Sequence, residues 1–287
     1  LPIMSEGLTT NSILCYRMLF ASVLVAVLMQ VRKIAFRTNL RELLWFAFLG
    51  FFYYGSASLL FQAYGTMSSG MATTLHFLYP VGVTLIMALV FKQRPSPFTI
   101  LAIILGLSGV ALLSLKEGGG SSSASLVGIL LVLLSGLSYA AYLVTMNNVR
   151  RVRESNNLKL TLYVLIFSAL FFLLDTSLSG GLQMIPSGRA LTNLLLLAFL
   201  PTLVSNLALV RAVKSIGSTL TSVLGAMEPL TAIVIGVVVF GEEVTRPMAL
   251  GILLILLSVT IIVLSPLLDK NIADRLRRLS KRPIRRQ

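Results

Sequence analysis

The fold is decided by residues 69–91, SGMATTLHFLYPVGVTLIMALVF, together with residues 218–240, STLTSVLGAMEPLTAIVIGVVVF, which repeat the pattern 149 positions later. The repeat aligns Pro80 with Pro229, each near the middle of an apolar run. The match extends further and covers residues 51–91 and 200–240 and, after one inserted residue, Pro97/Pro247 and Ser108/Ser258. An internal repeat of apolar runs predicts two similar halves that pack against each other in a membrane.

The composition is that of a membrane protein. Hydrophobic residues make up 56% of the 287 positions and charged residues 12%, whereas soluble domains carry about 25% charged residues. Polar residues lie in short strips between apolar runs of about 20 residues, the length that crosses a bilayer core as a helix. Runs this long and continuous are not barrel strands, so we expect an all-α polytopic membrane protein. Nine spans are predicted, at residues 9–30, 43–65, 69–91, 97–115, 125–148, 158–177, 190–212, 218–240 and 247–267.

The basic residues predict how the chain is oriented. Most of the 24 Lys and Arg cluster in or beside alternate gaps between the spans, at residues 31–42, 92–96, 149–159, 211–217 and 268–287. Positive charge stays on the cytoplasmic side of a membrane, so we expect these gaps and the C-terminus to be cytoplasmic. The net charge of +14 is therefore attributed to topology, and no nucleic-acid partner is expected.

The repeat also divides the chain into domains. We expect a first half at residues 1–117, an external Gly/Ser linker at 118–124, a second half at 125–267 and a basic cytoplasmic tail at 268–287. The second half holds five of the predicted spans and the first half four, so a counterpart of residues 125–148 is expected to be missing and the intact bundle to have ten spans. Because five is an odd number, the second half is predicted to lie inverted relative to the first.

Short motifs in both halves are typical of one transporter family. They are Tyr16-Arg17, Ser69-Gly70-Met71-Ala72-Thr73-Thr74 with Phe77-Leu78-Tyr79-Pro80, and Ala226-Met227-Glu228-Pro229-Leu230 followed by Gly241-Glu242. With these motifs the chain resembles the EamA-type transporters of the drug/metabolite transporter superfamily over essentially its whole length. The resemblance implies a helical bundle around a central cavity, in a bacterial-type inner membrane, that moves small metabolites. It favours export, with amino acids or related compounds as cargo.

The aligned prolines predict kinks. A proline inside a helix donates no backbone hydrogen bond and displaces the carbonyl four residues earlier, here those of His76 and Gly225. Freed backbone groups at membrane depth are tolerated where protein or a water-filled cavity satisfies them. We therefore expect Pro80 and Pro229 to be gating kinks that line a central site, with a kink required only for packing as the alternative.

Two ionisable residues of these spans are candidates for the substrate or coupling site. Glu228 is the only acidic residue well inside a predicted span, and such charges usually face a cavity or a partner. It is expected to take up a coupling proton, since a carboxyl group away from water holds its proton more readily. The alternative for Glu228 is an anchor paired with backbone or with Arg17. His76, the only histidine, is a candidate substrate ligand or a satisfied core residue.

Arg17, Tyr79 and Gln62 complete the set of candidate site residues. Arg17 lies about 12 Å into its span and would hold a substrate carboxylate in a two-pronged contact, or else snorkel or tie helices together. Tyr79 offers aromatic surface either to the cavity or to helix packing. Gln62 is the repeat counterpart of Arg211.

Three classes of function are compared. A secondary transporter that works by alternating access fits the repeat and the polar positions, with the lipid bilayer, a small-molecule substrate and protons as partners. A polytopic lipid-modifying enzyme would need a nucleophile, a base or a metal cluster, and the single cysteine, Cys15, and single histidine argue against one. A channel would show a ring of charge or a filter segment. No cofactor or metal is expected; substrate identity, direction, coupling ion and oligomeric state are left open.

Overall fold

The computed structural model describes residues 7–67, 69–114, 126–225, 227–228, 231, 246–247, 249–261 and 264. All regular secondary structure in these residues is helical. Helices long and apolar enough to cross a membrane number five in this part of the chain: α1 (Thr10–Val31), α2 (Leu40–Ala63), α6 (Leu126–Asn148), α8 (Asn157–Leu178) and the continuous helix Gly188–Ile216. Shorter apolar helices cover Tyr79–Leu89, Pro97–Leu112 and Ala249–Ile261. The prediction of an all-α polytopic membrane protein is therefore confirmed.

Contacts group the chain into two compact units. Unit 1 comprises Leu1–Val83 and Ser122–Thr221, and unit 2 comprises Thr84–Ser121 and Ser222–Gln287. Each unit takes helices from both halves of the sequence, because helices that correspond in the repeat pack on each other. The predicted linker 118–124, the basic tail 268–287 and Pro229 lie outside the described residues.

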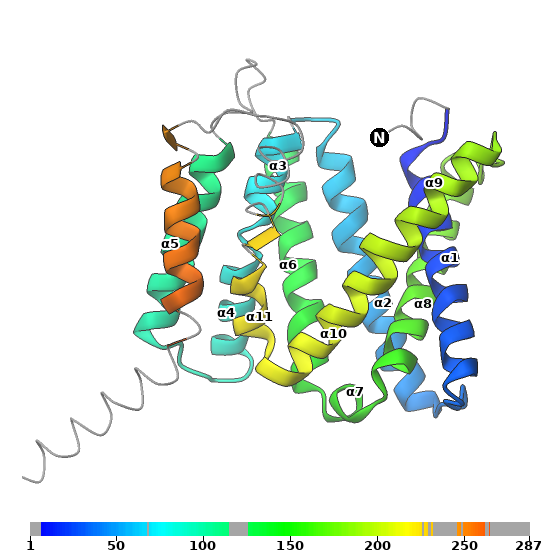
Figure 1. Cartoon of the computed structure of the whole chain (residues 1–287), viewed down its shortest axis with the longest axis horizontal. Helices are drawn as coiled ribbons and strands as arrows, with labels where there is room; N and C mark the ends of the chain where they lie inside the picture. The colour runs from blue at the N-terminus through cyan, green and yellow to red at the C-terminus, as the bar shows by residue number, and fades with distance from the viewer. Residues whose placement is uncertain are drawn as a thin grey trace, which may run out of the picture. The chain divides into compact units, whose positions relative to one another are not determined.

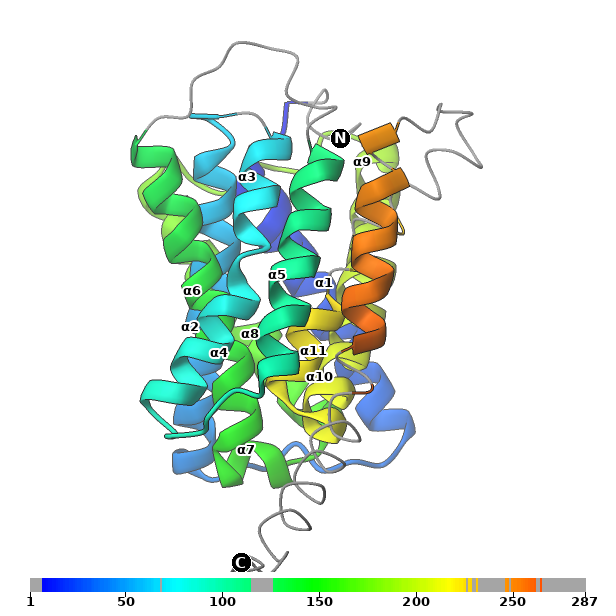
Figure 2. The same cartoon turned by 90° about the vertical axis from the view of Figure 1, so that its left-hand side faces the viewer.

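The core of unit 1 lies where α1, α2 and α8 meet (Figures 1 and 2). Its buried members include Leu14, Met18, Leu165 and Phe172. The backbones come close together at Gly50 of α2, where a Cβ would lie 2.6 Å from Phe167 Cβ. Ser168 also donates a hydrogen bond of 2.9 Å to the Gly50 carbonyl. A small residue and a serine–backbone hydrogen bond stabilise helix pairs in a bilayer, where no hydrophobic force acts between helices.

Helices that correspond in the repeat run in opposite directions within unit 1. The contacts between α1 and α8 join Asn11 to Asp175 (3.2 Å) and Cys15 to the Ala169 carbonyl (3.8 Å). Higher residue numbers on α1 thus meet lower ones on α8, which makes the two neighbouring helices antiparallel (Figure 1). These are the counterparts 9–30 and 158–177 of the sequence, so the inverted relation is confirmed for this pair.

Unit 2 contains a second pair of counterparts with the same relation. Helix α5 (Pro97–Ser114) packs on residues 249–261 so closely that a Cβ on Gly109 would lie 2.8 Å from the Gly251 carbonyl. Ser258 donates a hydrogen bond of 2.6 Å to the Ala102 carbonyl. Here too the residue numbers run oppositely along the contact, so α5 and its counterpart are antiparallel.

The helix Gly188–Ile216 changes its winding at a proline that the sequence reading had not singled out. It consists of α9 (Gly188–Ala198), a π-helical segment at Phe199–Val204 and α10 (Ser205–Ile216). Pro201 lies in the π segment and has no N–H to donate. Thr202 Oγ1 donates instead to the Leu197 carbonyl, 2.8 Å away. Wide turns of this kind often occur at functional sites.

Candidate functional site

The predicted span 69–91 is two helices separated by a break. Helix α3 covers Ser69–His76 and α4 covers Tyr79–Leu89, as Figure 2 shows. We expected one helix kinked at Pro80, but Pro80 is the second residue of α4. A proline fits the first turn of a helix, because the N–H groups there have no partner within the helix. Leu78 directly precedes α4, and its carbonyl accepts a hydrogen bond of 2.9 Å from the Val81 N–H in the first turn.

Helix α6 passes directly beside this break. A Cβ on Gly136 would lie 3.4 Å from the His76 carbonyl oxygen, the group that the proline was expected to free. One turn further on, Ala140 Cβ would lie 3.1 Å from a Cβ on Gly82. The pair Gly136/Ala140, four residues apart, therefore lets α6 approach the interrupted backbone closely.

Ser135 of α6 fixes the imidazole of His76. The Ser135 hydroxyl lies 2.6 Å from the Ser56 carbonyl of α2 and 3.1 Å from His76 Nδ1. A hydroxyl has one proton, and the carbonyl accepts it, so Ser135 is the acceptor for His76. The neutral imidazole then carries its proton on Nδ1, and Nε2 is left as a hydrogen-bond acceptor.

A series of aromatic rings leads from His76 across α6 to α2. The His76 ring lies 5.9 Å from that of Tyr139, and Tyr79 meets Tyr139 edge-on at 4.9 Å. Tyr139 stacks on Tyr142 at 6.0 Å, and Tyr142 lies 5.4 Å from Tyr53 of α2. These spacings are typical of favourable ring pairs.

The series ends at a buried polar pair. Asn206 of α10 donates a hydrogen bond of 3.0 Å to the Tyr53 hydroxyl and one of 2.8 Å to the Thr202 carbonyl in the π segment. Beside it, the Tyr142 hydroxyl is buried and has no hydrogen-bond partner among the described residues. An unsatisfied buried hydroxyl costs about 1–3 kcal/mol, so a group that bonds to the Tyr142 hydroxyl would recover free energy.

These residues together are called the break cluster: His76, Tyr79, Ser135, Tyr139, Tyr142, Tyr53 and Asn206. They come from five elements of unit 1, which are α2, α3, α4, α6 and α10. The π segment contributes through the Thr202 carbonyl, which accepts from Asn206. The cluster combines ring faces with uncharged donors and acceptors at membrane depth. That chemistry suits a small organic molecule with polar groups, because the rings offer apolar contact and the uncharged groups can donate and accept hydrogen bonds.

The remaining sequence candidates are placed elsewhere. Arg17 stands on α1, half-buried, and its Nε is buried without a partner among the described residues. Gln62 lies at the end of α2, exposed, with its Nε2 3.1 Å from Ser58 Oγ. Glu228 belongs to unit 2 and has an exposed side chain, and its N–H donates to the Gly225 carbonyl at 3.0 Å. Of the predicted residues, the structure therefore brings together His76, Tyr79 and Pro80.

Ser135 and Asn206 were not predicted to be members of this site. Tyr139 and Tyr142 are three residues apart on α6 and therefore share a helix face, on which their rings stack. For Asn206 a signal was present, since an amide inside an apolar span needs a partner. Nothing in the sequence indicated that its partner would be Tyr53.

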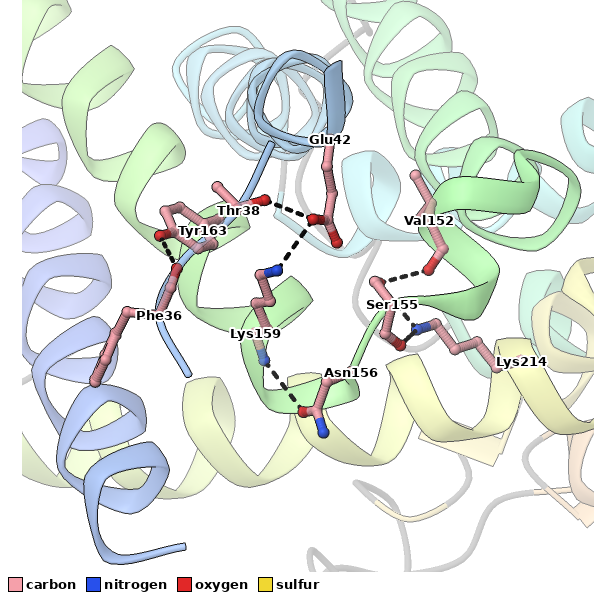
Figure 3. Close-up of polar contacts among 9 residues, drawn as sticks. All are labelled: Phe36, Thr38, Glu42, Val152, Ser155, Asn156, Lys159, Tyr163 and Lys214. Carbon is pink, nitrogen blue, oxygen red and sulfur yellow. Dashed lines mark hydrogen bonds and ion pairs between the residues drawn. The ribbon is translucent and has the colours of Figure 1, made fainter. Parts of the chain in front are cut away.

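The basic end of unit 1, where α2 and α8 begin, is held by a polar network (Figure 3). Glu42 of α2 accepts from Lys159 Nζ of α8 at 3.0 Å and from Thr38 at 2.6 Å. Lys214 of α10 donates to the Ser155 carbonyl at 2.8 Å. The Glu42–Lys159 ion pair joins the first half of the sequence to the second.

Comparison with known proteins assigns the family. The model of the EamA-like transporter family matches residues 2–115 and 126–264. The transporter YdfC of Bacillus subtilis, named as uncharacterized, is 26% identical over 249 residues, which cover 86% of this chain and 79% of the relative. The uncharacterized transporter sll1319 of Synechocystis is 26% identical over 239 residues, which cover 80% of this chain and 71% of the relative. A solved crystal structure shares the fold, with a TM-score of 0.77 at 17% identity over 91% of this chain and 88% of the other.

The chain therefore belongs to the EamA-like transporter family. It is a multi-pass membrane transporter, not an enzyme, and its named relatives are bacterial.

Proposed function

We propose that this protein moves small organic metabolites by alternating access and that the substrate contacts the break cluster. The observation that carries the proposal is the Tyr142 hydroxyl, which is buried at membrane depth without a partner among the described residues. A substrate group that bonds to it would recover the free energy lost by its burial. His76 Nε2 supplies an acceptor on the same aromatic series.

The inverted pairs of helices support the alternating-access part of this proposal. Two halves of opposite orientation exchange their conformations when the protein opens to the other side of the membrane. The Glu42–Lys159 ion pair joins the halves at the basic end and would have to open in that exchange. The distribution of Lys and Arg supports a cytoplasmic location for this end and for the C-terminus.

Proton coupling through Glu228 is the second part of the proposal. An ionised acidic group in a membrane segment costs free energy, and the acidic residues found there are usually functional. The Glu228 side chain is exposed at the surface of unit 2. Protonation and release of this carboxyl would link transport to the proton gradient. Export of amino acids or related compounds is the direction and cargo that we infer from the family resemblance.

The experiment is uptake of a metabolite panel into inside-out vesicles that contain the full chain, where uptake corresponds to export. We expect saturable uptake of one compound class, accelerated by the same compound on the opposite side. Acceleration of that kind distinguishes a carrier from a channel. Uptake that rises linearly with concentration, or that is not accelerated by the compound on the opposite side of the membrane, would contradict alternating access.

A further inference from the structure

A groove of about 570 Å³ opens at the basic end of unit 1, beside the network of Figure 3. It lies between the start of α2 and the short helix α7 (Arg150–Glu154). Its lining residues are Asn39, Leu40, Arg41, Glu42, Arg151, Glu154 and Ser155. This groove is separate from the break cluster, and the proposed transport function does not use it.

The charges around the groove leave two arginines available. Glu42 is paired with Lys159 at 3.0 Å, and Glu154 is paired with Arg150 at 2.8 Å. Arg41 and Arg151, both exposed, have no ion-pair partner within the described ranges. Because Glu42 and Glu154 are paired with cations outside the lining, the positive charges of Arg41 and Arg151 are not neutralised within the groove and favour an anion such as a phosphate group. Guanidinium groups bind phosphate oxygens in a two-pronged contact.

The first turn of α2 adds further donors to the same groove. Asn39 occupies the position before this helix, but its side chain makes no capping hydrogen bond. Backbone N–H groups at the start of a helix favour a negative charge nearby, and in α2 the Glu42 carboxyl supplies one and accepts from the Asn39 N–H. The helix has 24 residues, so the effect of its dipole is fully developed.

An apolar ridge runs from the groove along α2 and favours a phosphate that carries acyl chains over a soluble phosphate. Leu40 is 72% exposed and Leu44 is 62% exposed, and Phe48 and Phe51 continue the same face at helical spacing. Trp45, the only tryptophan, packs edge-on against Phe48 at 5.7 Å. Tryptophan is enriched where the headgroups meet the hydrocarbon. A molecule with a phosphate in the groove and acyl chains on the ridge would use both surfaces.

We propose that this groove binds the phosphate of an anionic phospholipid, with the headgroup held by Arg41 and Arg151. Basic pockets next to transmembrane helices on the cytoplasmic side recognise such headgroups. The lipid would contact α2 and α7 at the end where the ion pair joins the two halves.

The test measures lipid retained by the purified full chain, by native mass spectrometry after exchange into vesicles of phosphatidylglycerol and phosphatidylcholine. We expect the wild type to keep phosphatidylglycerol preferentially. The double variant Arg41→Gln/Arg151→Gln is expected to bind it about 25-fold more weakly, about fivefold for each arginine. The matched control is Arg153→Gln, an exposed arginine of α7 that does not line the groove. It is expected to stay within about twofold of the wild type.

Equal retention by the wild type and the double variant, or an equal loss in the Arg153 control, would overturn the proposal. A second arm adds glycerol phosphate without acyl chains. If it displaces phosphatidylglycerol at equal concentration, the groove binds a soluble phosphate and the lipid assignment is wrong. Helical circular dichroism of each variant verifies that the fold is retained, which is expected because the substituted side chains are exposed.

Discussion

At the scale of single residues, the Tyr142 hydroxyl is the group whose substitution tests the proposed binding site. This group is buried and has no partner among the described residues, so its removal relieves a cost. We predict that Tyr142→Phe raises the free energy of unfolding by about 1 kcal/mol, while the KM for the transported metabolite rises about fivefold to tenfold. Thermal unfolding in detergent and the concentration dependence of vesicle uptake measure the two effects.

The control for this substitution is Tyr163→Phe. The Tyr163 hydroxyl also lies on a membrane helix, but it donates to the Phe36 carbonyl at 2.7 Å at the basic end (Figure 3). Loss of that bond should lower stability by about 1 kcal/mol and leave the KM unchanged. A Tyr142→Phe protein that is less stable and transports with the wild-type KM would contradict the proposed role of Tyr142.

Glu228 is tested by the pH dependence of transport. Glutamine resembles the protonated carboxyl but binds no proton, so Glu228→Gln should remove the dependence of uptake on pH. The wild type should respond to a pH gradient across the vesicle membrane, and the variant should give the same rate at every pH. A variant that responds like the wild type would exclude Glu228 as the coupling group.

At the scale of secondary structure elements, close backbone approaches determine which glycines are essential. A Cβ on Gly50 would lie 2.6 Å from Phe167 Cβ and 3.1 Å from the Val164 carbonyl, so α2 and α8 would have to separate. On Gly136 the nearest atom would be the His76 carbonyl at 3.4 Å, an ordinary contact. We predict that Gly50→Ala lowers the free energy of unfolding by about 1–3 kcal/mol and that Gly136→Ala does not lower it.

Thermal unfolding of the two glycine variants, measured side by side, checks this prediction. Equal destabilisation would mean that α6 lies against the break more tightly than the structure shows. Stability gained at Gly50 would mean that α2 and α8 do not pack as described.

The break between α3 and α4 shows which features of a helix can be predicted from the sequence and which cannot. Apolar length and the aligned prolines predicted one span at 69–91 with a kink at Pro80, whereas the structure has two helices, Ser69–His76 and Tyr79–Leu89. The sequence did not predict a complete break, because a proline is compatible with a kink or with a new first turn. Tertiary contacts influence the choice, such as the hydrogen bond between His76 and Ser135, which is distant in sequence. The π segment at 199–204 was not predicted either, because Pro201 is compatible with several local windings of a helix.

At the scale of the whole molecule, the link between the two sequence halves is testable by a double-mutant cycle. The side chains of the Lys159–Glu42 pair are only 14% and 18% exposed, so their charges are poorly screened. We predict a coupling energy of about 1–2 kcal/mol from Glu42→Gln, Lys159→Gln and the double variant. The exposed pair Arg150–Glu154, within one helix, should give a much smaller coupling energy.

Equal coupling in the two cycles would mean that the ion pair between the halves is no more than a surface contact. A larger coupling for Lys159–Glu42, joined to faster transport in the single variants, would indicate that opening this end limits the rate.

The inverted architecture was the most predictable property of the molecule. The repeat offset and the odd number of spans predicted that counterparts run in opposite directions, as α1 and α8 do. The site was less predictable. Periodicity indicates which residues lie inside a membrane segment, but not which helix faces which. Arg17 and His76 looked equivalent in sequence, and only His76 meets the polar groups of α6.

The most direct test of the central claim is an experimental structure of the protein with its transported metabolite bound. The account predicts a polar atom of the metabolite within about 3.2 Å of the Tyr142 hydroxyl. It also predicts contact with the His76 and Tyr139 rings. A metabolite bound at a site that touches no member of the break cluster would contradict it.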